Sequence, residues 1–320
     1  MKLNLSIVSK DRALALWKTS PHASAFTHPH VLGLLAVDVH WWLCSNPEEP
    51  VCLWPVCVDH DGTVQLPGAT YYVGPLWMPA ESRIPVHRKL STHSAVYEIF
   101  IKHFIERYGC VRASLPLGLD DIRVFDWWNY GEADKPRFSI APRYTARIEG
   151  LQSKTMIDVM AGFRQVRRYE IKRIEKSPLL SRCTDWTASE LWQLYQEIFH
   201  AKGDEPGRNA RQSMQRMLDA VHAGFGELLA YRSEQGGLTY AGLMLYGKDT
   251  ANLVYSMVSR DYRNSGLAAW AIRNQIMTAK SRGLDVFDFN GANSPSRGDD
   301  KHSYGAKAAL FFEIALSKGE

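Results

Sequence analysis

The sequence lacks the patterns that mark disulfide or metal chemistry. Its five cysteines are an odd number, are widely spread and form no CxxC pair. This usage is typical of free thiols in a reducing compartment rather than of a disulfide framework. No HExxH motif is present, and Cys52 and Cys57 lie an odd number of residues apart, which on a strand directs them to opposite faces. We therefore expect no metal cofactor.

Long apolar runs are also absent. The longest nearly apolar stretch, residues 31–37, is far too short to cross a bilayer. The first twelve residues carry Lys2, Lys10, Asp11 and Arg12 around a short apolar stretch, which does not fit a signal peptide. These observations predict a cytoplasmic protein without a membrane span, while contact with a membrane surface stays open.

Two widespread enzyme motifs are missing as well. There is no GxSxG nucleophile elbow and no GxxxxGK[ST] phosphate loop, since residues 150–155 match the latter only in part. The net charge of +4 is mild, and 45% hydrophobic with 22% charged residues is the composition of a globular protein. Such a charge permits an anionic partner, such as a nucleotide, a phosphorylated lipid head or RNA. We expect no binding to DNA.

What is present is a repeated order of elements. At 320 residues the chain is long enough for two domains. In each half an antiparallel meander precedes a helix that stops at a glycine, Gly109 or Gly283, and a further strand follows. The order predicts two copies of one α/β unit with a boundary near Gly150. We expect a mixed α+β architecture of two domains, 1–150 and 151–320, each a mostly antiparallel mixed sheet flanked by helices.

The apolar periodicity and the turn residues also predict single elements. The expected helices are 11–19, 91–108, 156–176, 188–200, 211–222 and 266–281. The expected strands are 39–44, 51–58, 63–66, 71–76, 110–115, 144–148, 227–232, 239–246, 252–259, 285–290 and 308–316.

Residues 252–281 combine a strand, a loop and a helix in an order that suits phosphate binding. The first turn of a helix presents unpaired N–H groups and the positive end of its dipole. Gly266 lets the backbone approach phosphate oxygens, and the small Ala268 leaves the same surface unobstructed. Arg263 can add charge-assisted hydrogen bonds. The simpler alternative is a glycine that serves only the turn.

The same residues resemble the acyl-CoA pyrophosphate loop of the GNAT acyltransferase superfamily, [Q/R]-x-x-G-x-[G/A], which follows a central strand and opens a helix. Arg263, Gly266 and Ala268 satisfy this pattern in the expected order. The resemblance implies acyl-CoA as a donor bound along this segment. Its expected contacts are Tyr255, Met257, Val258, Arg263, Ser265, Gly266, Leu267 and Ala268.

Further segments are similar to FemABX-like proteins, which are tandem GNAT proteins. They are the basic helix at 163–176, YVGPL at 72–76, FDFNG at 287–291 and KHSYG at 301–305. The last is similar to the family pattern F-K-x-x-F-G, with Asp300 in place of the first Phe and Tyr304 in place of the second. The resemblance implies the transfer of an acyl or aminoacyl group to an amine.

Candidate substrate-binding residues follow from this resemblance. Lys301 matches the family lysine that contacts a substrate phosphate, and Arg168 and Lys172 lie on the basic helix. Asn290 completes this set. The stripe of cations at four-residue steps suits tRNA, CoA phosphates or a lipid-linked pyrophosphate. A solvated helix face paired with its own acidic residues explains the stripe equally well.

Catalytic candidates follow from the chemistry of amide formation, which needs a base for the amine, donors for the oxyanion and an acid for the leaving group. Asp288 is the candidate base, and backbone N–H groups at 256–258 are candidate oxyanion donors. Tyr304 is the candidate acid for the leaving thiolate, with Lys301 as a stabiliser of charge. Strand aspartates and aromatic residues near a chain end also serve structure alone.

The leading hypothesis is an acyltransferase that moves an acyl group from acyl-CoA to an amine on a sugar or a lipid-linked cell-envelope precursor, as in polysaccharide modification. An aminoacyl-tRNA-dependent transferase of the FemABX type, with tRNA as partner, is the first alternative. A non-catalytic binding module of the same fold is the second. Pro75 removes an N–H from the corresponding place in the first half, so we expect a single donor site.

Overall fold

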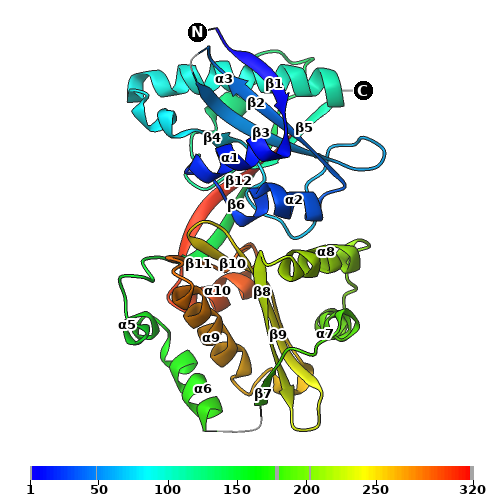
Figure 1. Cartoon of the computed structure of the whole chain (residues 1–320), viewed down its shortest axis with the longest axis vertical. Coiled ribbons are helices and arrows are strands. Elements are labelled where there is room, and N and C mark those ends of the chain that lie inside the picture. The colour runs from blue at the N-terminus through cyan, green and yellow to red at the C-terminus, as the bar shows by residue number, and fades with distance from the viewer. Residues whose placement is uncertain (1, 48, 177–179, 202, 318–320) are drawn as a thin grey trace. The chain divides into compact units, whose positions relative to one another are not determined.

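The computed structural model describes residues 2–47, 49–176, 180–201 and 203–317. The chain forms two compact units, one of Met1–Arg143 with Leu310–Glu320 and one of Tyr144–Ala309 (Figure 1). The strands β6 (Ser139–Ile148) and β12 (Lys307–Ser317) each contain residues of both units. These bounds differ from the expected 1–150 and 151–320 because the end of β12 pairs with β5 (Cys110–Ser114) of the first unit.

The first unit is built on an antiparallel sheet in the order β1 (Asn4–Val8), β2 (Asp38–Ser45), β3 (Pro50–Val58) and β4 (Leu76–Trp77). The long helix α3 (Val86–Tyr108) places Val96, Phe100 and Phe104 in a core shared with β2, β3 and β5. Gly109 ends this helix with a φ of 72°, a conformation that glycine adopts without steric cost. The remaining helices of the unit are α1 (Lys10–Thr19), η1 (Ala25–Thr27), α2 (Pro29–Leu35), η2 (Pro79–Arg83) and α4 (Arg123–Asp126).

The second unit contains a mixed sheet in the order β6, β11, β10, β9, β8, β7. Its strand pairs are antiparallel except for β10 and β11, which run parallel. The bounds are β7 (Leu180–Cys183), β8 (Gly226–Ser233), β9 (Leu238–Tyr246), β10 (Thr250–Val258) and β11 (Val286–Asp288). β11 is shorter than the expected strand 285–290, because Asn290 adopts a left-handed φ of 51° that ends the extended chain.

Helices cover both faces of this second sheet. α6 (Gln165–Glu175) and α9 (Leu267–Ser281) share one core with the strands, whereas α7 (Ala188–His200) and α8 (Ala210–His222) lie on the other side (Figure 1). α5 (Met156–Ala161) and α6 are two helices rather than the expected single one at 156–176, since Arg164 is extended, with a ψ of 148°. α10 (Pro295–His302) follows β11, and η3 (Arg260–Tyr262) follows β10.

Two further expectations concern thiols and membrane spans. Cys44, Cys52, Cys57 and Cys183 are buried free thiols, and Cys110 is a half-buried one. Within the described ranges, no helix combines the length and the apolar character that a bilayer crossing requires.

Candidate functional site

The site centres on the divergence of β10 and β11 in the second unit. The two strands pair only from Thr250 opposite Val286 to Asn252 opposite Asp288, while β10 continues to Val258. On its other side β10 pairs with β9, and the register shifts between Leu253 and Tyr255. Such a bulge bends a strand and re-aims its backbone groups. Residues 253–258 of β10 therefore lie beyond the ladder with β11.

The predicted phosphate loop joins this strand to α9. Gly266 caps the helix with a φ of 94°, and the Ser265 hydroxyl accepts a hydrogen bond from the Leu267 N–H at 3.0 Å. The amides that follow belong to the first turn, whose N–H groups an α-helix leaves without an internal partner. The loop thus presents a helix N-terminus at the end of the diverging strand.

Helix α6 supports the loop from one side. A Cβ on Gly266 would lie 2.8 Å from the Cβ of Glu170 and 3.0 Å from its carbonyl oxygen. Arg173 donates from Nε to the Ser265 carbonyl at 2.9 Å and from Nη2 to the Asn264 carbonyl at 2.7 Å. The close approach at Gly266, which the sequence predicted for a phosphate, is made here by α6.

The expected donor contacts lie in different surroundings. Met257 and Leu267 are buried, and Val258 packs against the core of the unit. The Tyr255 ring meets Tyr195 of α7 edge-on, with 5.7 Å between the ring centroids. Partly exposed side chains are found at Arg263, Ser265 and Ala268. At the buried positions, only backbone groups are available to contact an acyl donor.

Asp288, the candidate base, is a buried carboxylate at the end of β11, with 1% of its surface exposed. Its Oδ1 accepts hydrogen bonds from the Thr145 hydroxyl and from the Asn290 N–H, the latter at 2.8 Å. Its Oδ2 lies 3.8 Å from Nε of Arg147. These contacts hold the turn after β11, so the carboxylate has a structural role in addition to the predicted role as a base.

Asn290 and Lys301 meet next to the bulge. The Asn290 side chain donates from Nδ2 to the Leu253 carbonyl at 3.1 Å and so links the turn to β10. Lys301 donates from Nζ to the carbonyls of Asn290 and Gly291, the second at 2.6 Å. The structure therefore brings Asp288, Asn290 and Lys301 together. The Lys301 ammonium contacts backbone carbonyls at the turn that follows β11.

Tyr304, the candidate acid, is 1% exposed. Its ring stacks on Phe289 with 5.6 Å between the centroids, and the Arg167 guanidinium lies 5.2 Å from the ring centre. Among the described residues its hydroxyl has no hydrogen-bond partner. Burial raises the pKa of Tyr304 well above its ordinary value, so the phenol keeps its proton at neutral pH.

Arg167 is a residue of the site that the sequence did not single out. It donates to Asp300 at 2.5 Å, to the Ser303 hydroxyl at 2.8 Å and to Glu170 at 2.9 Å. It thereby ties α6 to the segment that carries Lys301 and Tyr304. The sequence contained a signal for it, since Asp300 places an acid where the family pattern has Phe.

Several side chains of the expected basic stripe on α6 bind other groups of the second unit. Arg168 donates from Nη1 to the carbonyls of Ala161 and Phe163 at 3.0 and 2.9 Å, and so caps the end of α5. Arg164 forms an ion pair with Asp299 at 2.6 Å. Lys172 is exposed. Of the two expected substrate contacts on this helix, Lys172 is the one whose side chain faces solvent.

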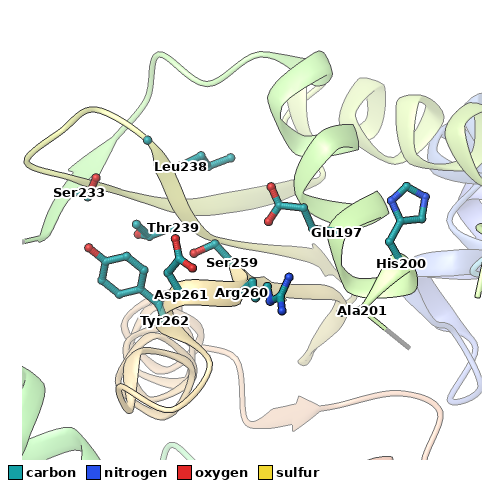
Figure 2. A pocket seen from close by; sticks show the side chains of 11 residues that line it. Glu197, His200, Ala201, Ser233, Leu238, Thr239, Ser259, Arg260, Asp261 and Tyr262 are labelled. Atoms are coloured by element: carbon teal, nitrogen blue, oxygen red, sulfur yellow. The ribbon is translucent and has the colours of Figure 1, made fainter. Parts of the chain in front are cut away.

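A pocket of about 560 Å³ adjoins the start of the loop (Figure 2). Its walls are the last turn of α7, the hairpin between β8 and β9, and the passage from β10 into η3. The residues predicted from sequence do not line it, although Tyr262 on its wall directly precedes Arg263. The described part of the chain holds no group of three or more His, Cys, Asp or Glu side chains placed to bind a metal ion.

Comparisons with known proteins bear on the second unit and on the fold. Residues 161–302 match the family model described as an acetyltransferase (GNAT) domain. A search of curated proteins found no match to the chain.

Solved structures share the fold over nearly the whole chain. FemX is 9% identical, with 97% of this chain and 96% of that chain covered and a TM-score of 0.64. A tandem GNAT protein from the clavulanic acid biosynthesis pathway is 14% identical, with 100% of both chains covered and a TM-score of 0.54. The C-terminal domain of a candidate lysylphosphatidylglycerol synthetase from Agrobacterium fabrum is 11% identical, with 97% and 92% covered and a TM-score of 0.54.

These findings confirm two predictions. The resemblance to the GNAT superfamily and to FemABX-like tandem proteins holds, and so does the mixed α/β fold of sheets flanked by helices. The matched range runs from α6 through the predicted phosphate loop to α10, and it contains Asp288 and Lys301. The chain thus has an acyltransferase-type fold.

Proposed function

We propose that the second unit transfers an acyl group from acyl-CoA to an amine on a sugar or a cell-envelope precursor. The observation that carries this proposal is the divergence of β10 from β11 after Asn252, followed by the helix N-terminus at Gly266. Acyl-CoA joins an extended chain with amide groups to a pyrophosphate. A strand edge that runs on beyond the ladder with β11 suits the amides, and a helix N-terminus suits the pyrophosphate.

The reaction would proceed beside the bulge. The amine nitrogen attacks the thioester carbonyl, the carbon–sulfur bond breaks, and the amine loses one proton while the thiolate gains one. Among the described residues the Tyr304 hydroxyl has no hydrogen-bond partner, which supports it as the donor to the thiolate. Asp288 is a carboxylate at the end of β11, next to the bulge of β10 that its neighbour Asn290 contacts, which supports it as the base.

An aminoacyl-tRNA donor is the second candidate. The fold similarity to FemX and to a lysylphosphatidylglycerol synthetase domain supports it and would bring tRNA or a lipid-linked acceptor as partner. Exposed Lys172 on α6 is the side chain that we assign to such a polyanion. A binding module without turnover is the third candidate, supported by the structural contacts of Asp288 and Lys301.

The variant Ala268→Glu tests the donor site. Ala268 is half-buried in the first turn of α9, where a carboxylate is compatible with the helix but repels a pyrophosphate. We expect calorimetric titration to show saturable acetyl-CoA binding that weakens at least about tenfold in this variant. Met277→Glu makes the same charge change at an exposed position of α9 and serves as the control.

Three outcomes separate the candidates. Equal affinity for acetyl-CoA in both variants would contradict the donor site. No response to acetyl-CoA, together with binding of charged tRNA, would favour the aminoacyl-tRNA transferase. Binding of acetyl-CoA without product formation across a panel of amines would favour the module.

A further inference from the structure

The pocket beside η3 brings together charged side chains that the acyl donor does not explain. Glu197 comes from the last turn of α7, and Arg260 and Asp261 come from η3. All three side chains are exposed. Figure 2 shows the Glu197 carboxylate pointing from its helix toward the wall that carries Ser259 and Asp261.

These charges lack partners of their own. In the part of the chain that the structure describes, Glu197, Arg260 and Asp261 make no side-chain hydrogen bond and no ion pair. Some other exposed charges of the same unit do have partners, as for Arg164 with Asp299 at 2.6 Å. Two carboxylates and one guanidinium therefore face the pocket with their charges available to a ligand.

The balance of charge favours one class of ligand. Two carboxylates at one pocket create a negative potential, which attracts an ammonium group and repels the phosphates of CoA. The single guanidinium offers a planar pair of donors that fits a carboxylate. The pocket volume of about 560 Å³ lies in the range of small-molecule sites and is open enough for a group that continues into a larger molecule.

We propose that this pocket binds a ligand that carries both an ammonium and a carboxylate, such as an amino acid or the end of a peptide. Glu197 and Asp261 hold the ammonium, and Arg260 holds the carboxylate. The chain continues directly from Tyr262 into the donor loop at Arg263, so the ligand lies beside the donor. That this ligand is the acyl acceptor rests on the proposed function, whereas its binding does not.

The test uses the full chain and lysine as a probe, with calorimetry in the absence of any acyl donor. We expect saturable binding of L-lysine that weakens about fivefold to tenfold in Glu197→Gln and in Asp261→Asn. Arg260→Gln should weaken L-lysine to a similar degree but leave lysinamide, which lacks the carboxylate, unchanged. Nα-acetyl-lysine has no α-ammonium and so shows whether the α-ammonium is needed, and a peptide that ends in lysine distinguishes a peptide from a free amino acid.

Matched measurements keep this proposal separate from the donor site. Glu234→Gln removes an exposed carboxylate in the turn between β8 and β9, outside the pocket lining, and should bind L-lysine normally. Acetyl-CoA affinity should stay unchanged in Glu197→Gln. Absent lysine binding, or equal binding in all variants, would overturn the inference while leaving the acetyl-CoA result intact. Loss of acetyl-CoA affinity in Arg260→Gln, with a gain in Glu197→Gln, would instead assign the pocket to the donor.

Discussion

Gly266 and Glu170 approach so closely that a Cβ added to the glycine would stand 2.8 Å from the Glu170 Cβ. Gly266 is the N-cap of α9, and Glu170 lies in the middle of α6. The contact fixes where the first turn of α9 stands, and the hydrogen bonds from Arg173 to the loop carbonyls reinforce it. Helix α6 therefore shapes the predicted phosphate loop through its backbone as well as through its charges.

Replacing Gly266 by alanine should destabilise the protein more than a glycine replacement in open space. Gly266→Ala combines an unfavourable φ of 94° with the collision at Glu170, whereas Gly283 has a φ of 80° and no atom within 4 Å of an added Cβ. We expect Gly283→Ala to cost about 1 kcal/mol and Gly266→Ala about 3 kcal/mol or more. Urea unfolding measures both free energies, and equal losses would show that α6 shifts enough to accommodate the added methyl group.

Arg167→Gln should lower the free energy of unfolding by about 1–3 kcal/mol, since the half-buried guanidinium serves Asp300, Ser303 and Glu170 at once. Arg164→Gln removes an exposed ion pair with Asp299 and should cost below about 1 kcal/mol. Tyrosine fluorescence and thermal unfolding report the effect. A smaller loss for Arg167→Gln than for Arg164→Gln would contradict the role of Arg167 as the tie between α6 and α10.

Glu190 should make stability depend on acid pH. Hydrogen bonds from Arg232, and from the Thr187 amide and hydroxyl, lower the pKa of Glu190 from 4.5 to about 2. The folded state thus favours the carboxylate, so its contribution is complete above the unfolded pKa and is lost as pH falls from about 4.5 toward 2. Thermal melts should show a steeper fall of Tm over this window in the natural chain than in Glu190→Gln. Glu234→Gln, at an exposed carboxylate, should run parallel to the natural chain.

Thiol titration of the folded protein should show one fast-reacting cysteine. Cys110 is half-buried, whereas burial raises the pKa of Cys44 to about 11 and of Cys57 to about 12. Reaction with a disulfide reagent requires an accessible thiolate. We expect the fast phase to disappear in Cys110→Ser and all five thiols to react in urea. A fast phase that persists in Cys110→Ser would mean that a second thiol is accessible.

Asp288→Asn separates the structural use of this carboxylate from a catalytic one. The amide loses charge and one acceptor, so we expect a loss of about 1–3 kcal/mol in unfolding free energy. Thr145→Val removes one of the same hydrogen bonds but keeps the carboxylate. If Asp288 is the base, single-turnover amide formation should fall in Asp288→Asn and persist in Thr145→Val. A normal rate in Asp288→Asn would remove Asp288 as the base.

The fold could be predicted where the pattern is local. The expected helix 188–200 is found as α7, and the glycines that stop α3 and α9 have φ of 72° and 80°. The expected strand 71–76 is reduced to β4 at Leu76–Trp77, since Tyr72 has a left-handed φ of 59°. α10 carries no apolar stripe, and ion pairs from Arg164 and Arg167 hold it. Such contacts are distant in sequence, so periodicity does not reveal them.

The candidate site could likewise be predicted only in part. The motif residues around Gly266 and the set of Asp288, Asn290 and Lys301 were expected, and the structure brings this set together at one turn. The pocket was not expected, because its walls come from three segments, 197–201, 233–239 and 259–262, that share no spacing. Arg168 was assigned to substrate, but its guanidinium reaches the carbonyls of Ala161 and Phe163, an end of α5 that the sequence did not show.

The pairing of β12 with β5 has a consequence for biosynthesis. Ala315 lies opposite Arg112 in this ladder, so the two strands that meet there are separated by about the length of the whole second unit. On the ribosome the first unit emerges without its last strand and stays incomplete until translation has passed residue 310. The edge of β5 is exposed during that interval. The first unit therefore completes its fold only after the second unit has been synthesised.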